Sequence, residues 1–132
     1  MMAIYLAKAI TLAMLALQMV SCTPNTNVTS VLCNSGVYTS GDPFGASLSY
    51  ILSDLEAVTP TKKDRDYRNI SPYPNAFAYG HAACNAILSE SDCAACLTSA
   101  NASMFASCDM RIGARCVLYD CNVRYEQYPF ND

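Results

Sequence analysis

The cysteines are the feature that most constrains what this chain can fold into. The 132-residue sequence contains eight of them, and three stand together as Cys84-x8-Cys93-x2-Cys96. A cluster of this kind can bind zinc, carry out thiol–disulfide exchange or cross-link a small domain. The other five are spread along the chain: Cys22, Cys33, Cys108, Cys116 and Cys121.

Structural disulfides are the use we predict for these cysteines. Cys93 and Cys96 have the spacing of half a zinc site, but no second pair has the matching spacing. They also stand where a helix is expected to begin, which lowers a thiol pKa, yet the βαβ context of a thioredoxin-like redox motif is missing. We therefore expect neither a metal nor another cofactor. The residues alone leave the pairing of the cysteines open.

Residues 1–22 predict a secretory signal peptide. Lys8 is followed by an apolar run, 9–20, that is too short to cross a bilayer of about 30 Å. Small and polar residues come next, so we expect cleavage within 21–25, and the fate of Cys22 stays open. Residues 23–132 then form a single domain, and no second hydrophobic run predicts a membrane anchor.

The charge of the chain disfavours nucleic acid and anionic membranes as partners. Residues 23–132 carry seven Lys and Arg against eleven Asp and Glu, a net charge of −4. Binding to an array of phosphates requires clustered basic side chains. The one basic cluster is interleaved with acidic residues over 62–68, as expected for a solvated loop.

The first half of the domain predicts one strand and one helix. A strand is expected to end near Cys33. Between 44 and 58 the apolar residues recur at helical spacing, with Pro43 near the start and Pro60 after the end. Residues 59–75 hold three prolines and most of the charge, which predicts a loop or an excursion at the edge of a sheet.

The second half predicts a helix between strands. Alternation over 76–84 is typical of a strand with His81 on one face. A second helix should follow, capped by Ser89 or Ser91. Residues 114–128 are rich in β-branched and aromatic side chains and predict one or two closing strands. The resulting fold class is α+β, with two helices on a largely antiparallel sheet.

The cysteine triplet and its surroundings resemble the ginkbilobin-type domain of land plants, also called the stress-antifungal or cysteine-rich secretory repeat domain. The resemblance covers Cys33 to Phe130 and is strongest to the single-domain antifungal lectins of this family. It implies about five antiparallel strands, two helices and three disulfides. The matching motifs are Cys33-Asn34, Ala78-Tyr79-Gly80, Ser91-Asp92-Cys93, Ala95-Cys96-Leu97, Ile112-Gly113-Ala114-Arg115, Asp120-Cys121 and Tyr125-Glu126-Gln127.

The resemblance also implies which cysteines pair. Cys116 lies where the family pattern has an apolar residue, and we favour a buried free thiol there over a bridge to Cys22 or to another molecule. The implied pairs are Cys33–Cys108, Cys84–Cys93 and Cys96–Cys121.

Mannose binding is the activity that the resemblance implies. The antifungal lectins bind mannose through an Asn, an Arg and a Glu, which correspond by motif to Asn34, Arg115 and Glu126. Arg only donates hydrogen bonds, ionised Glu only accepts them and Asn does both, which suits adjacent sugar hydroxyls. Two simpler roles stand beside this one: Asn34 as a turn residue, and Arg115 with Glu126 as a cross-strand ion pair.

These features together predict a secreted, mannose-binding antifungal protein of the plant apoplast, a monomer or weak oligomer acting on mannan of the fungal wall. Three sequons, at Asn27, Asn69 and Asn101, suit export through a glycosylating pathway. No catalytic motif surrounds the single histidine, His81, so an enzyme is not expected. The alternatives are an extracellular protein-interaction or signalling module without sugar binding, and a protease inhibitor using 60–75 as an exposed loop.

Overall fold

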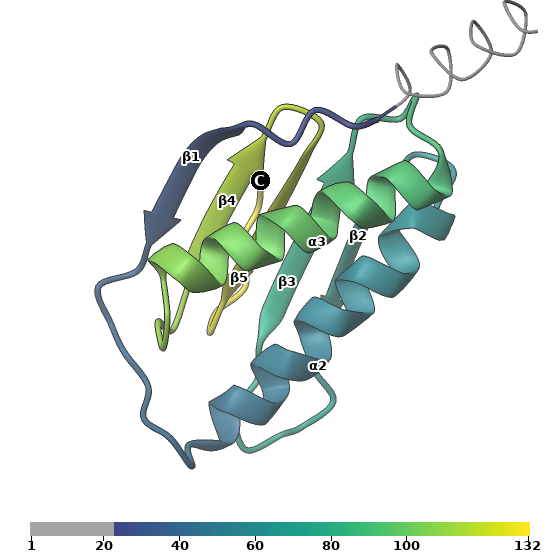
Figure 1. The fold of residues 1–132 in the computed structure, drawn as a ribbon. Coiled ribbons are helices and arrows are strands. Elements are labelled where there is room, and N and C mark those ends of the chain that lie inside the picture. The colour runs from purple at the N-terminus through teal and green to yellow at the C-terminus, as the bar shows by residue number, and fades with distance from the viewer. Residues whose placement is uncertain (1–22) are drawn as a thin grey trace, which may run out of the picture.

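The structure, a computed structural model, describes residues 23–132; the expected signal peptide and Cys22 lie outside the described residues. Two helices pack on one face of a five-stranded sheet (Figure 1). The strands are all antiparallel to their neighbours, in the order β1-β4-β5-β3-β2, which confirms the predicted α+β class. The elements are β1 (Val28–Cys33), α2 (Pro43–Val58), η1 (Thr59–Thr61), β2 (Asp66–Ile70), β3 (Tyr79–Cys84), α3 (Glu90–Ser107), β4 (Ala114–Leu118) and β5 (Cys121–Glu126).

Both helices begin with the caps that their sequences favour. At α2 the Asp42 side chain accepts a hydrogen bond from the Phe44 backbone nitrogen at 2.9 Å. At α3 the Ser89 hydroxyl accepts one from the Asp92 nitrogen at 3.1 Å, so Ser89 rather than Ser91 is the cap. Such caps satisfy backbone donors that have no partner inside the helix. The predicted apolar faces of both helices are buried against the sheet.

The stretch 59–75 is an edge excursion rather than a loop. After the short turn η1, residues 66–70 form β2, which pairs with β3 at one edge of the sheet. The strand cannot be recognised from the sequence because most of its side chains are polar. Such a composition is compatible with its position, since an edge strand needs little apolar surface. Only the turns on either side of β2, at 62–65 and 72–75, remain as the exposed segments that the protease-inhibitor alternative would use.

The helices pack closely against β3. A Cβ atom on Gly80 would lie 2.7 Å from Cγ1 of Ile51 and 2.9 Å from Cδ1 of Leu55, so only glycine allows α2 this approach. Tyr79 and His81 lie on the other face of the sheet, which we call the open face. The strand begins at Tyr79, three residues after the start of the predicted strand 76–84, so Phe77 lies outside it.

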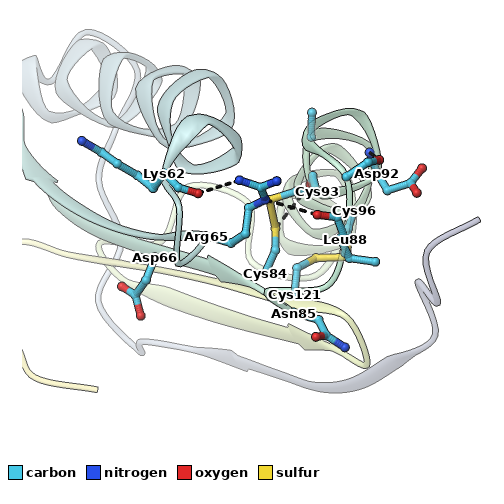
Figure 2. The surroundings of a disulfide bond; sticks show 12 residues. Lys62, Arg65, Asp66, Cys84, Asn85, Leu88, Asp92, Cys93, Cys96 and Cys121 are labelled. Atoms are coloured by element: carbon cyan, nitrogen blue, oxygen red, sulfur yellow. Dashed lines mark hydrogen bonds between the residues drawn. A yellow bond between two sulfur atoms is a disulfide. The ribbon is translucent and has the colours of Figure 1, made fainter.

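Three disulfides cross-link the fold, and they are the pairs that the resemblance implies. Two of them fasten α3 to the adjacent ends of β3 and β5 (Figure 2). The third joins the end of β1 to the residue after α3. Cys116 is a free, buried cysteine, and its burial raises the pKa of the thiol. The bridges are Cys33–Cys108, Cys84–Cys93 and Cys96–Cys121.

Within residues 23–132 no three His, Cys, Asp or Glu side chains gather in a way that could hold a metal ion. None of the helices in the same range is long and apolar enough to cross a membrane.

Candidate functional site

Asn34, Arg115 and Glu126 line a single depression of about 290 Å³. Each comes from a different segment: Asn34 follows the last residue of β1, Arg115 lies in β4, and Glu126 ends β5. The other residues lining the depression are Leu32, Cys33, Ala114 and Arg124.

Strand register explains why these residues meet. Arg115 in β4 is the partner of Leu32 in β1 and of Arg124 in β5. Side chains two residues apart on a strand point to the same face, so Arg124 and Glu126 share the face that carries Arg115. The depression therefore lies on the open face, on the side of the sheet away from the helices.

Asn34 has the turn role that the simpler interpretation predicts. Its side-chain Oδ1 accepts a hydrogen bond from the Gly36 nitrogen at 2.9 Å, and its own backbone nitrogen donates to the Gly113 carbonyl at 2.8 Å. The Arg111 guanidinium also donates to the Asn34 carbonyl at 2.9 Å. Among the described residues the side-chain NH₂ has no acceptor, so the turn fixes the amide and leaves its donors available for a ligand.

Glu126 is a buried carboxylate whose hydrogen bonding is incomplete. The residue is 7% exposed, and within residues 23–132 its Oε2 atom is buried without a partner. A buried polar atom costs free energy unless it is hydrogen-bonded, so a ligand or water hydroxyl would stabilise this group. Gly113 makes room for it, because a Cβ at that position would lie 2.6 Å from the Glu126 Cδ atom.

The simpler alternative for Arg115 and Glu126, a cross-strand ion pair, is not formed within residues 23–132. The guanidinium that reaches Glu126 belongs to Arg124, with Nε 3.4 Å from Oε1. Arg115 is exposed and has no ion-pair partner among the described residues. The sequence reasoning missed Arg124, although its spacing of two from Glu126 in a predicted strand already placed both side chains on one face.

A short closing segment, Pro129–Asp132, folds over the open face; we call it the strap. The Asp132 carboxylate is 10% exposed and lies 2.6 Å from Nη1 of Arg124 and 3.5 Å from Nδ1 of His81. The Arg124 guanidinium carbon lies 4.2 Å from the centroid of the Phe130 ring, a cation–π distance. The strap therefore holds Arg124 beside Glu126.

His81 has the packed role expected for it. It is buried on the open face beneath the strap, and its Nε2 lies 2.8 Å from Oδ1 of Asp66 in the edge strand β2. Arg68, also in β2, donates to the backbone carbonyls of Phe130 at 3.1 Å and Asp132 at 2.9 Å. These contacts attach the strap to the sheet on the side away from the depression.

Docking of the strap should weaken in acid. Burial is the largest influence on the pKa of Asp132 and raises it, but hydrogen bonds and charge from Arg124, with His81 and Arg115, lower it below its ordinary value of 3.8. A lowered pKa means that Asp132 stabilises the docked strap above pH 3.8 and that this contribution is lost as the pH falls through the lower value in the folded protein.

The aromatic proton shifts of Phe130, followed by NMR, should therefore change with a midpoint below pH 3.8 in the wild type. The variant Asp132→Asn should lack this transition, because the amide does not titrate. The same midpoint in that variant would show that another carboxylate controls the strap.

The three sequons differ in how accessible their acceptor nitrogens are. Asn69 donates from Nδ2 to Asp54 at 2.8 Å, and Asn101, which is buried, donates to Glu56 at 2.6 Å. Asn27 is exposed just before β1. Of the three predicted positions, Asn27 has the most accessible side chain.

Comparison with known proteins matches the chain to one family over most of its length. The model of the salt stress response/antifungal family matches residues 32–128. Antifungal protein ginkbilobin-2 of Ginkgo biloba is 38% identical over 130 residues, which cover 97% of this chain and 94% of that protein. Antifungal protein ginkbilobin-like protein 1 of Picea sitchensis is 40% identical over 107 residues, 80% of each chain.

Solved structures show the same fold at lower sequence identity. The tandem DUF26 ectodomain of the Arabidopsis thaliana cysteine-rich receptor-like protein PDLP5 superposes with a TM-score of 0.73 at 21% identity. The aligned region covers 79% of this chain and 51% of that ectodomain, so the chain spans about half of the tandem structure. From the family match and from curated relatives aligned over most of their length, the chain belongs to the salt stress response/antifungal family.

Proposed function

We propose that this protein is an extracellular mannose-binding lectin with antifungal activity, and that it acts by binding rather than by catalysis. One observation carries the proposal: an amide, a guanidinium and a buried carboxylate, contributed by three separate segments, line the same depression. Relatives named as antifungal proteins, aligned over most of their length, support the biological role.

The hydrogen-bonding capacities of the three groups are complementary to a sugar. Arg115 offers donors and forms no ion pair within residues 23–132, while Glu126 has a buried acceptor oxygen that no protein group in that range uses. Asn34 adds the donors of its NH₂ group. Neighbouring hydroxyls of a hexose both donate and accept, so such a set can hold two of them at once.

Binding of one sugar should nevertheless be weak. A hydrogen bond to a charged group contributes roughly 1.5–3 kcal/mol, and part of that replaces bonds to water. A fungal wall presents many mannose units side by side, so repeated or multivalent contacts would raise the apparent affinity. The partner we infer is therefore mannan of the wall rather than free mannose.

The disulfides support action outside the cell. Of the seven cysteines in residues 23–132, six form bridges in the structure, as is usual for proteins in oxidising compartments. We infer that the protein is secreted to the apoplast, where it would meet fungal walls.

Retention on immobilised mannan tests the proposal. We expect the wild type to be retained, and Asn34→Ala, Arg115→Ala and Glu126→Gln each to lower the affinity at least tenfold, the equivalent of about 1.4 kcal/mol. Matched controls are Lys63→Ala and Glu90→Gln, which change the same charges at exposed positions outside the depression. Both controls should bind like the wild type.

Failure of the folded wild type to bind mannan would contradict the lectin function. The chain would then be better described as an extracellular interaction or signalling module that uses the same scaffold without a sugar. If the control variants lose as much affinity for mannan, retention depends on the overall charge of the protein rather than on the depression.

A further inference from the structure

We propose that the open face carries a second sugar-binding subsite beside the first, so that the protein binds at least two consecutive hexose units of a mannan chain. The subsite is a depression of about 560 Å³ between the edge strand β2, the strand β3 and the strap. This inference rests on the proposed lectin function and extends it from a single mannose to an oligosaccharide. The residues that line the subsite are Arg68, Asn69, Ile70, Tyr79, Gly80, Pro129 and Phe130.

Strand pairing places the two depressions next to each other. Tyr79, which lines the larger one, is the register partner of Glu126, which lines the smaller one. Side chains directly opposite each other on an antiparallel pair have Cβ atoms about 4.5–5.5 Å apart. The two subsites therefore adjoin across a single pair of strands.

The strap provides a second link between them. The Phe130 ring lines the larger depression and lies 4.2 Å from the guanidinium carbon of Arg124, which lines the smaller one. The guanidinium carbon of Arg68, which also lines the larger depression, lies 5.7 Å from the same ring. An oligosaccharide that extends from the first subsite across Arg124 would therefore contact the Phe130 ring with its next unit.

The sizes of the depressions favour an oligosaccharide. Small-molecule sites usually have volumes of about 300–1,000 Å³. The smaller depression, at about 290 Å³, stands at the lower end of this range, whereas the larger one, at about 560 Å³, lies well inside it. One hexose held by Asn34, Arg115 and Glu126 would leave the larger depression unused.

The chemistry of the larger depression suits the apolar side of a sugar ring. Tyr79, Pro129 and Phe130 provide apolar surface, and Phe77, 41% exposed, extends it by packing its ring 6.5 Å from that of Tyr79. A hexose has carbon-bound hydrogens on its faces and hydroxyls on its rim, so it can cover an aromatic ring while its hydroxyls stay hydrated. The first subsite would provide the charged hydrogen bonds, and the second would provide apolar contact area.

The second subsite is also held in place before a ligand arrives. Arg68 donates hydrogen bonds to the main-chain oxygens of Phe130 and Asp132, and Arg124 is paired with the Asp132 carboxylate, so the strap is attached to both β2 and β5. A surface that is already ordered loses less conformational entropy when it binds.

Calorimetric titration with mannose, α-linked mannobiose and α-linked mannotriose tests the second subsite. We expect the wild type to bind the longer sugars at least tenfold more tightly than mannose. Tyr79→Ala should remove this gain and leave the affinity for mannose unchanged, while Tyr79→Phe should keep it. Tyr119→Ala is the matched control, because that tyrosine is 68% exposed and lies outside both depressions.

Three results would overturn the inference. If the wild type binds mannose but gains nothing from longer sugars, the second subsite is wrong and the first stands. If Tyr79→Ala weakens mannose and mannotriose by the same factor, Tyr79 belongs to the first site or to the fold. If no sugar binds, the lectin function itself fails, and the second subsite with it. Should Tyr79→Ala not fold, Ile70→Ala gives the same comparison, because Ile70 is 47% exposed and lines only the larger depression.

Discussion

Replacing both Cys33 and Cys108 with alanine should lower the free energy of unfolding by about 4–5 kcal/mol, the largest loss expected from any one disulfide. In the chain-entropy model a cross-link stabilises by restricting the unfolded chain, and the effect grows with the length of the closed loop. This bridge spans a sequence separation of 75, against 25 and 9 for the other two. Urea denaturation at equilibrium measures the loss.

The same double variant should also weaken sugar binding, because Cys33 immediately precedes Asn34 and holds the end of β1 in place. The matched control is the pair Cys84→Ala and Cys93→Ala, which opens the shortest loop, away from the depression. It should cost about 2.5 kcal/mol and leave mannan retention unchanged. A larger loss from the control pair would show that packing around the buried sulfurs outweighs loop closure.

Gly113→Ala should abolish mannan retention while leaving the fold nearly as stable as the wild type. The added methyl group would collide with the Glu126 carboxylate, whose Cδ lies 2.6 Å from the new Cβ position. The carboxylate is the far end of a flexible side chain, so it can turn away, and the fold should change in stability by less than about 1 kcal/mol. Displacing it removes the acceptor on which sugar binding depends, and we expect a loss as large as that of Glu126→Gln.

Gly45→Ala is the matched control for this substitution. Gly45 lies in α2, where a new Cβ would contact only Tyr38, at 3.6 Å. Alanine favours a helix over glycine by about 0.8–1 kcal/mol, so this variant should be slightly more stable and bind mannan normally. Thermal unfolding and mannan retention of both variants, measured together, separate a change in the site from a change in the fold. Normal retention by Gly113→Ala would show that Glu126 does not contact the sugar.

Local signals explain which parts of the fold could be predicted from sequence. The helix α2 combines a capping Asp42, a proline at its first turn and apolar residues at helical spacing, all within one stretch of chain. The strand β2 lacks such a signal, because its polar side chains are typical of a loop and only its pairing with β3 makes it a strand. Pairing of this kind depends on residues far away in the sequence.

In the candidate site, too, some features could be predicted from the sequence and others depend on residues far apart in the chain. Asn34, Arg115 and Glu126 were found by resemblance to family motifs, since nothing in their own neighbourhoods indicates that β1, β4 and β5 bring them together. Arg124 was missed because its role depends on the strap folding back over the open face. The larger depression was missed for the same reason, as two of its walls are the edge strand and the strap.

The strand order has a consequence for how the protein is made. Although β1 comes first in the described chain, its only neighbour in the sheet is β4, so that edge cannot form until residues 114–118 have been synthesised. Until then the Cys33 thiol has no native partner held nearby, whereas Cys84 and Cys93 emerge close together. Long-range pairing of this kind slows folding, and oxidation of the cysteines should therefore proceed from the short bridge to the long one.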